Sequence, residues 1–160
     1  MKEIALAQIT MNDGTDRKIF RLKSLDDTVS PNGYGWFGGE LGNHPVLDQP
    51  ENPISGMVRQ LREQTSLRMT LGSEQLNFGV YSRHIVPPEY SPDDTRVKVH
   101  LFDAFIRDGV NYQSAFAGVD HLVATNKELL KGHDVVPMVR FILEQMAVER
   151  NYRLMNGGDI

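Results

Sequence analysis

The chain of 160 residues contains no cysteine. This absence excludes disulfide bonds, metal sites built on thiolates and a cysteine nucleophile. Long apolar runs are missing as well, since none approaches the roughly 20 residues that a membrane-spanning helix needs. The N-terminal segment turns polar too early for a signal peptide. We therefore expect a cytoplasmic protein with no membrane partner.

Positive charge is also scarce. Lysine and arginine together number 17 against 21 acidic residues, which gives a formal net charge of −4. This balance lacks the basic surface that nucleic acid requires, so we expect no nucleic-acid partner. The chain length suits one domain with a core. We place that domain at residues 1–155 and expect residues 156–160 to form a disordered tail.

Apolar residues recur with the period of strands in several segments. The strands expected from this pattern cover residues 4–9, 17–23, 76–86, 96–107 and 117–124. Asn12, Asp13 and Gly14 tolerate the backbone angles of a tight turn, which predicts a hairpin between the first two strands.

Capping residues mark the starts of three expected helices. Asn52 is a suitable N-cap and Pro53 a suitable first residue for the earliest helix. Thr125 and Glu128 match a capping box that opens a short second helix, and Asp134 is expected to cap the last one. Strands, one helix, strands and then helices suit an α+β arrangement in which helices cover a mixed sheet on two sides. The pattern alone does not separate this sandwich from other α+β folds.

The segment ENPISGMVRQLREQTSL, from Glu51 to Leu67, is the most informative about function. Within it, Gln60, Glu63 and Gln64 are three and four positions apart, so they share one face of a helix. If all three positions held carboxylates, these would repel one another unless a cation lay between them. Hard oxygen ligands of this kind suit Mg²⁺.

This spacing resembles the signature of the Nudix hydrolases, G-x5-E-x7-R-E-U-x-E-E-x-G-U, where U is a bulky apolar residue. The matching positions are Gly38, Gly39, Glu51, Arg59, Leu61, Glu63 and Leu67. Gln60 and Gln64 stand where the family has glutamates, Ser66 stands where it has glycine, and the interval from Gly39 to Glu51 is longer than the family pattern. The resemblance implies a Nudix-like α/β/α sandwich with a mixed sheet.

The same resemblance implies cleavage of a pyrophosphate bond with Mg²⁺ or Mn²⁺. Glu63 is then the chief metal ligand, Gln60 and Gln64 assist through their carbonyl oxygens, and the Gly39 carbonyl completes the site. These residues are the catalytic candidates. A carboxamide carries no formal charge, so we expect weak metal binding.

Other residues have expected roles beside the helix face. Glu51 and Arg59 form a charge-assisted pair that ties the loop to the helix. Tyr34, Trp36 and Glu40 are candidates for substrate binding, although an aromatic at a strand end, such as Trp36, is more often part of the core. The five histidines show no metal-ligand spacing, so we expect them to be surface or core residues.

Three interpretations remain open from the sequence. The first is a weakened Nudix-like hydrolase of a nucleoside diphosphate linked to another moiety. The second is a catalytically degenerate Nudix-fold module that binds a nucleotide or a protein. The third is an unrelated α+β protein. For the first two we expect a small nucleotide-type ligand, and the assembly to consider besides a monomer is a homodimer.

Overall fold

The structure is a computed structural model that describes residues 1–23, 33–43, 46, 48–70, 74–91 and 94–155, with side chains as far as residue 150 apart from that of Lys23. The tail expected at 156–160 lies outside the described residues. The described strands are β1 (Lys2–Thr10), β2 (Lys18–Lys23), β3 (Gly33–Gly35), β4 (Phe37–Glu40), β5 (Leu76–Val86), β6 (Val97–Ile106) and β7 (His121–Ala124). The helices are α1 (Pro53–Gln64), the 3-10 turn η1 (Pro88–Tyr90), α2 (Tyr112–Ala115), α3 (Asn126–Gly132) and α4 (Pro137–Met155).

Strand β1 is the centre of a mixed sheet. It pairs in parallel with β6 along its whole length, from Lys2 opposite Val97 to Thr10 opposite Phe105. On its other edge it pairs antiparallel with β4 and, near its end, with β2. The main path of the sheet is β3-β2-β1-β6-β5, and β7 lies beside β2. The predicted hairpin between β1 and β2 is confirmed, and the Met11 N–H donates to the Arg17 carbonyl at 2.9 Å.

Strands β3 and β4 are absent from the strands expected above, because glycine has a low preference for strands. Glycine is needed here for a different reason. Gly38 has φ of +127°, and a Cβ at this position would collide with the backbone carbonyl of Ala5 on the paired strand. Only glycine therefore lets β4 lie this close to β1.

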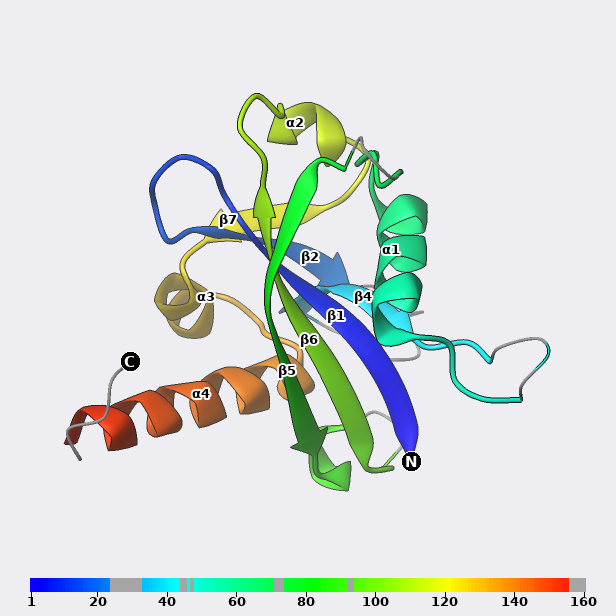
Figure 1. Cartoon of the computed structure of the whole chain (residues 1–160). Coiled ribbons are helices and arrows are strands. Elements are labelled where there is room, and N and C mark those ends of the chain that lie inside the picture. The colour runs from blue at the N-terminus through cyan, green and yellow to red at the C-terminus, as the bar shows by residue number, and fades with distance from the viewer. Residues whose placement is uncertain (24–32, 44–45, 47, 71–73, 92–93, 156–160) are drawn as a thin grey trace.

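Helices cover both faces of the sheet, as Figure 1 shows, and this confirms the predicted α/β/α sandwich. On one face, α1 buries Met57 and Leu61 against the side chains of alternate β1 residues. On the other face, α4 buries its apolar residues against β1 and β6. The core residues that α4 contributes are Met138, Val139, Ile142 and Leu143. Because β1 contributes to both cores, it is buried on both sides, as its sequence predicts.

The helix caps agree with the sequence at two of three places. The Asn52 side chain accepts a hydrogen bond from the Ile54 N–H, with Pro53 as the first helical residue. Thr125 caps α3 by accepting from the Glu128 N–H. The prediction that Asp134 caps the last helix is wrong, because α4 begins only at Pro137. Residues 134–136 instead run beside Tyr34 of β3, and their backbone groups are used there.

The last strand is shorter than expected. Residues 112–115 form helix α2 and residues 116–119 form a turn, so β7 keeps only His121–Ala124 of the predicted 117–124. Among the described residues, the helices are all too short or too polar to cross a membrane.

The core under α1 gives a stability prediction. Leu61 is fully buried, so Leu61→Ala should lower the free energy of unfolding by about 3 kcal/mol through lost burial and a cavity. The matched control is Ile54→Ala on the same helix, where the side chain is 37% exposed and the loss should stay below about 1 kcal/mol. Urea denaturation measures both. Equal losses would mean that the α1 core is not packed as described.

Candidate functional site

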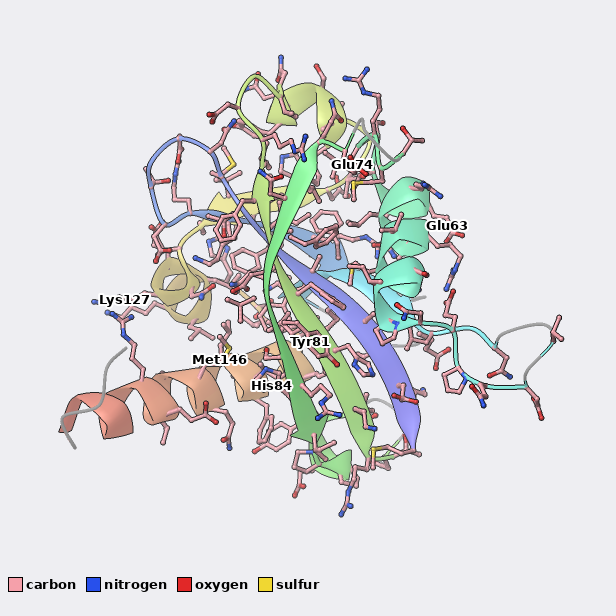
Figure 2. All side chains as sticks on the ribbon, in the orientation of Figure 1. Glu63, Glu74, Tyr81, His84, Lys127 and Met146 are labelled. Atoms are coloured by element: carbon pink, nitrogen blue, oxygen red, sulfur yellow. The ribbon has the colours of Figure 1, made fainter. Side chains whose placement is uncertain are left out.

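Helix α1 directs two of its three candidate side chains toward strand β4 and the third toward solvent. Gln60 is only 8% exposed, and Gln64 is partly buried beside it. The side chain of Glu63 is 61% exposed, and Figure 2 shows it on the outer side of α1. Residues 60 and 64 therefore share a site, while the one carboxylate of the three faces away from it.

The two glutamines form a continuous hydrogen-bond network with the backbone of β4. Gln64 Oε1 accepts from the Gly38 N–H at 2.9 Å, and Gln64 Nε2 donates to the Gly38 carbonyl at 3.0 Å. The same Nε2 donates to Gln60 Oε1 at 2.9 Å. Gln60 Nε2 donates to the Glu40 carbonyl at 2.9 Å. A backbone N–H only donates and a carbonyl only accepts, so these partners fix the orientation of both amides.

This arrangement does not fit the Mg²⁺ or Mn²⁺ site that the resemblance implies. A divalent cation needs several oxygen atoms directed at one point. Here amide N–H groups face the carbonyls of Gly38 and Glu40, and both carboxamide oxygens already accept hydrogen bonds. In the part of the chain that the structure describes, no three His, Asp or Glu side chains are grouped to hold a metal.

Gly39 contributes by having no side chain. A Cβ at this position would lie 3.0 Å from both Nε2 and Oε1 of Gln60. The glycine therefore leaves room for the Gln60 carboxamide to reach β4. Glutamine differs from glutamate in having N–H donors, and both glutamines use them here.

The pair of Glu51 and Arg59 joins the loop before α1 to the helix. Arg59 Nη2 donates to Glu51 Oε1, which also accepts from the Gly42 N–H at 2.7 Å. Arg59 Nη2 lies 3.4 Å from the Glu40 carbonyl as well, so the guanidinium reaches the end of β4. The hydrogen bond from Arg59 holds the pKa of Glu51 below its ordinary value of 4.5, against the opposing effect of burial. These contacts have the geometry of a structural tie.

The three substrate-binding candidates lie in different surroundings. Trp36 is fully buried in the core on the α4 side, so its ring has no free face for a nucleobase. Glu40 is exposed, and its carboxylate forms an ion pair with Lys2 at 3.0 Å. Tyr34 is partly exposed and contacts the ring of His133 edge-on, with 5.6 Å between ring centroids.

The fold is that of the Nudix hydrolases. The structure resembles the MutT protein from Methanosarcina mazei Go1 with a TM-score of 0.62, at 14% identity over 93% of this chain and 94% of that one. It resembles the Nudix hydrolase RenU from M. smegmatis with a TM-score of 0.56, at 15% identity over 92% of this chain and 85% of that one. At such identities the likeness shows the fold alone.

A third similar structure is a chain of the complex between the C-terminal domain of mouse MUTYH and human PCNA. Its TM-score is 0.54, at 10% identity over 94% of this chain and 90% of that one. No protein-family model matches the chain, and no curated protein matches it. The fold is therefore established by structure and not by sequence similarity.

The ion pair predicts a pH dependence of stability. The pKa of Glu51 is lowered in the folded state, so its contribution is present above the ordinary value of 4.5 and is lost as pH falls through the folded value. Glu51→Gln should lower the free energy of unfolding by about 1 kcal/mol at pH 7, a figure reduced for the partial exposure of Arg59. The difference from the natural chain should shrink toward pH 3. Glu63 forms a longer ion pair with the same Arg59, at 3.6 Å and with its own side chain 61% exposed. Glu63→Gln therefore serves as the control and should change stability by less than about 0.5 kcal/mol.

The amide network predicts the cost of restoring a glutamate. Gln64→Glu removes the donor to both the Gly38 carbonyl and Gln60 Oε1, so the free energy of unfolding should fall by about 1–3 kcal/mol at pH 7. The loss should be smaller near pH 4, because a protonated carboxyl donates one O–H. Gln145→Glu, at an exposed position of α4, is the matched control. Equal small effects at both positions, by urea denaturation, would contradict the network.

Proposed function

We propose that this chain is a Nudix-fold binding module that takes a nucleotide-type ligand without hydrolysing it at the α1 site. The observation that carries this proposal is the closed hydrogen-bond network of Gln60, Gln64, Gly38 and Glu40. A pyrophosphate hydrolase needs a cation to stabilise charge on the phosphate oxygens. Here the neutral amides of Gln60 and Gln64 satisfy the hydrogen-bonding groups of β4 without a cation.

The weakened hydrolase remains the competing hypothesis. It is supported by the Glu51–Arg59 pair and by the glycines of β4, which match the family signature. Both features have structural uses in this chain, however. Glu51 and Arg59 fix the loop, and the glycines admit β1 on one side and Gln60 on the other. Their presence therefore does not require catalysis.

Tyr34 and His133 are the proposed contact for the ligand base. The backbone of Tyr34 is clamped on both sides, since its N–H donates to the Asp134 carbonyl at 2.8 Å and its carbonyl accepts from the Val136 N–H at 3.0 Å. The clamp needs Gly33, because a Cβ there would lie 2.9 Å from the Asp134 carbonyl oxygen. The clamp fixes the backbone of Tyr34, and the edge-on contact with His133 restrains its ring. A restrained ring loses less entropy when a base stacks on it.

The fold also occurs in a protein complex, that of the MUTYH C-terminal domain with PCNA. Fold does not determine activity, so the likeness to Nudix hydrolases does not by itself require hydrolysis in this chain.

Calorimetric titration of the full chain tests the proposal. ADP and ADP-ribose should bind with the same affinity in about 5 mM Mg²⁺ and in EDTA, because the proposed contact with Tyr34 and His133 needs no cation. This Mg²⁺ concentration lies severalfold above a millimolar dissociation constant. Tyr34→Leu should weaken this binding roughly tenfold, as expected for one lost stacking contact. Chromatography of the mixtures should find no released AMP. Turnover that requires Mg²⁺ and is lost in Glu63→Gln would establish the hydrolase instead.

A double substitution tests the same idea in the opposite direction. Gln60→Glu combined with Gln64→Glu replaces the neutral amides by carboxylates, so Mg²⁺ binding should strengthen at least tenfold relative to the natural chain, an expectation based on the charge added. Gln113→Glu with Gln145→Glu adds the same charge at exposed positions and serves as the control. Unchanged Mg²⁺ affinity in the first variant would mean that this helix face is not the inherited metal position.

A further inference from the structure

Three side chains form a second hydrogen-bonded row, apart from the α1 site. Tyr81 Oη lies 2.5 Å from His100 Nδ1, and His100 Nε2 lies 2.9 Å from Glu3 Oε1. They come from β5, β6 and β1, three adjacent strands of the sheet. Glu3 and His100 are 97 positions apart in the chain, so no sequence motif predicts the row.

The partners decide where the protons lie. A carboxylate can only accept, so the hydrogen of the imidazole is on Nε2 and points to Glu3. Nδ1 is then the lone-pair nitrogen, and the Tyr81 hydroxyl donates to it. A phenol, a base and a group that orients the base therefore stand in the order found in activated nucleophiles.

A bulge in β5 places Tyr81 over His100. Phe78 is opposite Ala104 and Tyr81 is opposite Phe102, so the register shifts by one residue between Phe78 and Tyr81. Without that shift, residues 78 and 81 would point to opposite faces. Figure 2 shows Tyr81 and His84 on different sides of β5, with His84 on the side of α4. The bulge thus brings Tyr81 to the α1 face, where Glu3 and His100 lie.

Burial separates the base from the phenol. His100 is 5% exposed, while Tyr81 is 44% exposed. The two rings are nearly parallel, with an interplanar angle of 12°, and Tyr81 packs against Phe102 with 4.9 Å between centroids. The base is therefore buried, while part of the tyrosine that it contacts is exposed at the surface.

We propose that Tyr81 is a nucleophilic residue that His100 activates and Glu3 positions, and that it accepts an activated acyl group. In this step the Tyr81 oxygen attacks the carbonyl carbon of an ester or acyl phosphate. The phenolic proton passes to His100 Nδ1, and the bond between the carbonyl carbon and the leaving oxygen breaks with its electron pair on that oxygen. His100 then releases the proton to water, which leaves an O-acyl tyrosine.

The charges around the row favour a donor with an anionic leaving group. Arg83 is exposed and lies opposite His100 in the β5–β6 pairing, hence on the same face as Tyr81. Lys98 lies 3.8 Å from Glu3, whose single negative charge is shared with His100. Phosphate is the leaving group that a guanidinium recognises well, so acyl phosphates are the preferred class.

Acylation by p-nitrophenyl acetate, mapped by peptide mass spectrometry, tests the activation. Tyr90 is the internal control, because it is 39% exposed and its ring packs at a tilt of 36° against Phe141. Tyr81 should react roughly 100-fold faster than Tyr90, the lower range of general-base assistance. Equal rates at the two tyrosines in the natural chain would overturn the proposal.

Two substitutions separate activation from mere exposure. His100→Gln should bring the Tyr81 rate to within about threefold of Tyr90, because the base is gone. Glu3→Gln keeps an acceptor for the Nε2 hydrogen and removes the charge, so it decides the question if the first variant does not fold by circular dichroism. An unchanged Tyr81 rate in folded Glu3→Gln would overturn the positioning role of Glu3.

The donor class has its own test. Arg83→Gln should slow acetylation of Tyr81 by acetyl phosphate about tenfold, because a charge-assisted contact to phosphate is lost. The rate with neutral p-nitrophenyl acetate should not change. Equal rates of the natural chain and Arg83→Gln with acetyl phosphate would overturn the preference for an anionic leaving group. The activation of Tyr81 is tested separately, by the comparison with Tyr90.

Discussion

The structure around helix α1 depends on one side chain that bonds both backbone groups of a single glycine. Gln64 accepts from the Gly38 N–H and donates to the Gly38 carbonyl. Gly38 is also the residue that must lack a side chain for β4 to lie beside β1. The Gln64 carboxamide thus binds α1 to β4, the strand that pairs with the central strand β1. Glutamate cannot make both contacts in its ionised form, because a carboxylate has no hydrogen to donate.

Replacing carboxylates by amides changes what the scaffold needs for its stability. A cluster of carboxylates is stable only when a cation offsets their repulsion, so metal binding and local structure are coupled. Gln60 and Gln64 satisfy each other and the backbone without a charge. Glu51 still contacts both Arg59 and the Gly42 N–H, and this ion pair does not involve the glutamines. The scaffold and the cation site are therefore separable in this chain, which explains how a family signature can persist in part.

Much of the fold could be predicted from the sequence, because local rules decide those parts. The β1–β2 hairpin follows from turn residues, and the starts of α1 and α3 follow from Asn52 and Thr125. The start of α4 could not be predicted, since Asp134 is a good local cap whose backbone carbonyl instead pairs with Tyr34 across the sheet. The glutamine network and the Tyr81–His100–Glu3 row were also beyond reach. Each depends on strands that only tertiary pairing brings together.

The glutamine network and the row of Tyr81, His100 and Glu3 both lie on the α1 face of the sheet. They differ in how far each can be inferred from a related fold. The glutamine network lies at the helix positions of the family signature, so the resemblance already directs attention to it. The row of Tyr81, His100 and Glu3 depends on a bulge in β5, and a bulge re-aims side chains while it bends and twists the strand locally. A likeness at 14% identity shows the shared fold and does not show which side chains stand at these positions. The function of this chain is therefore better inferred from the hydrogen bonds of its side chains than from its fold.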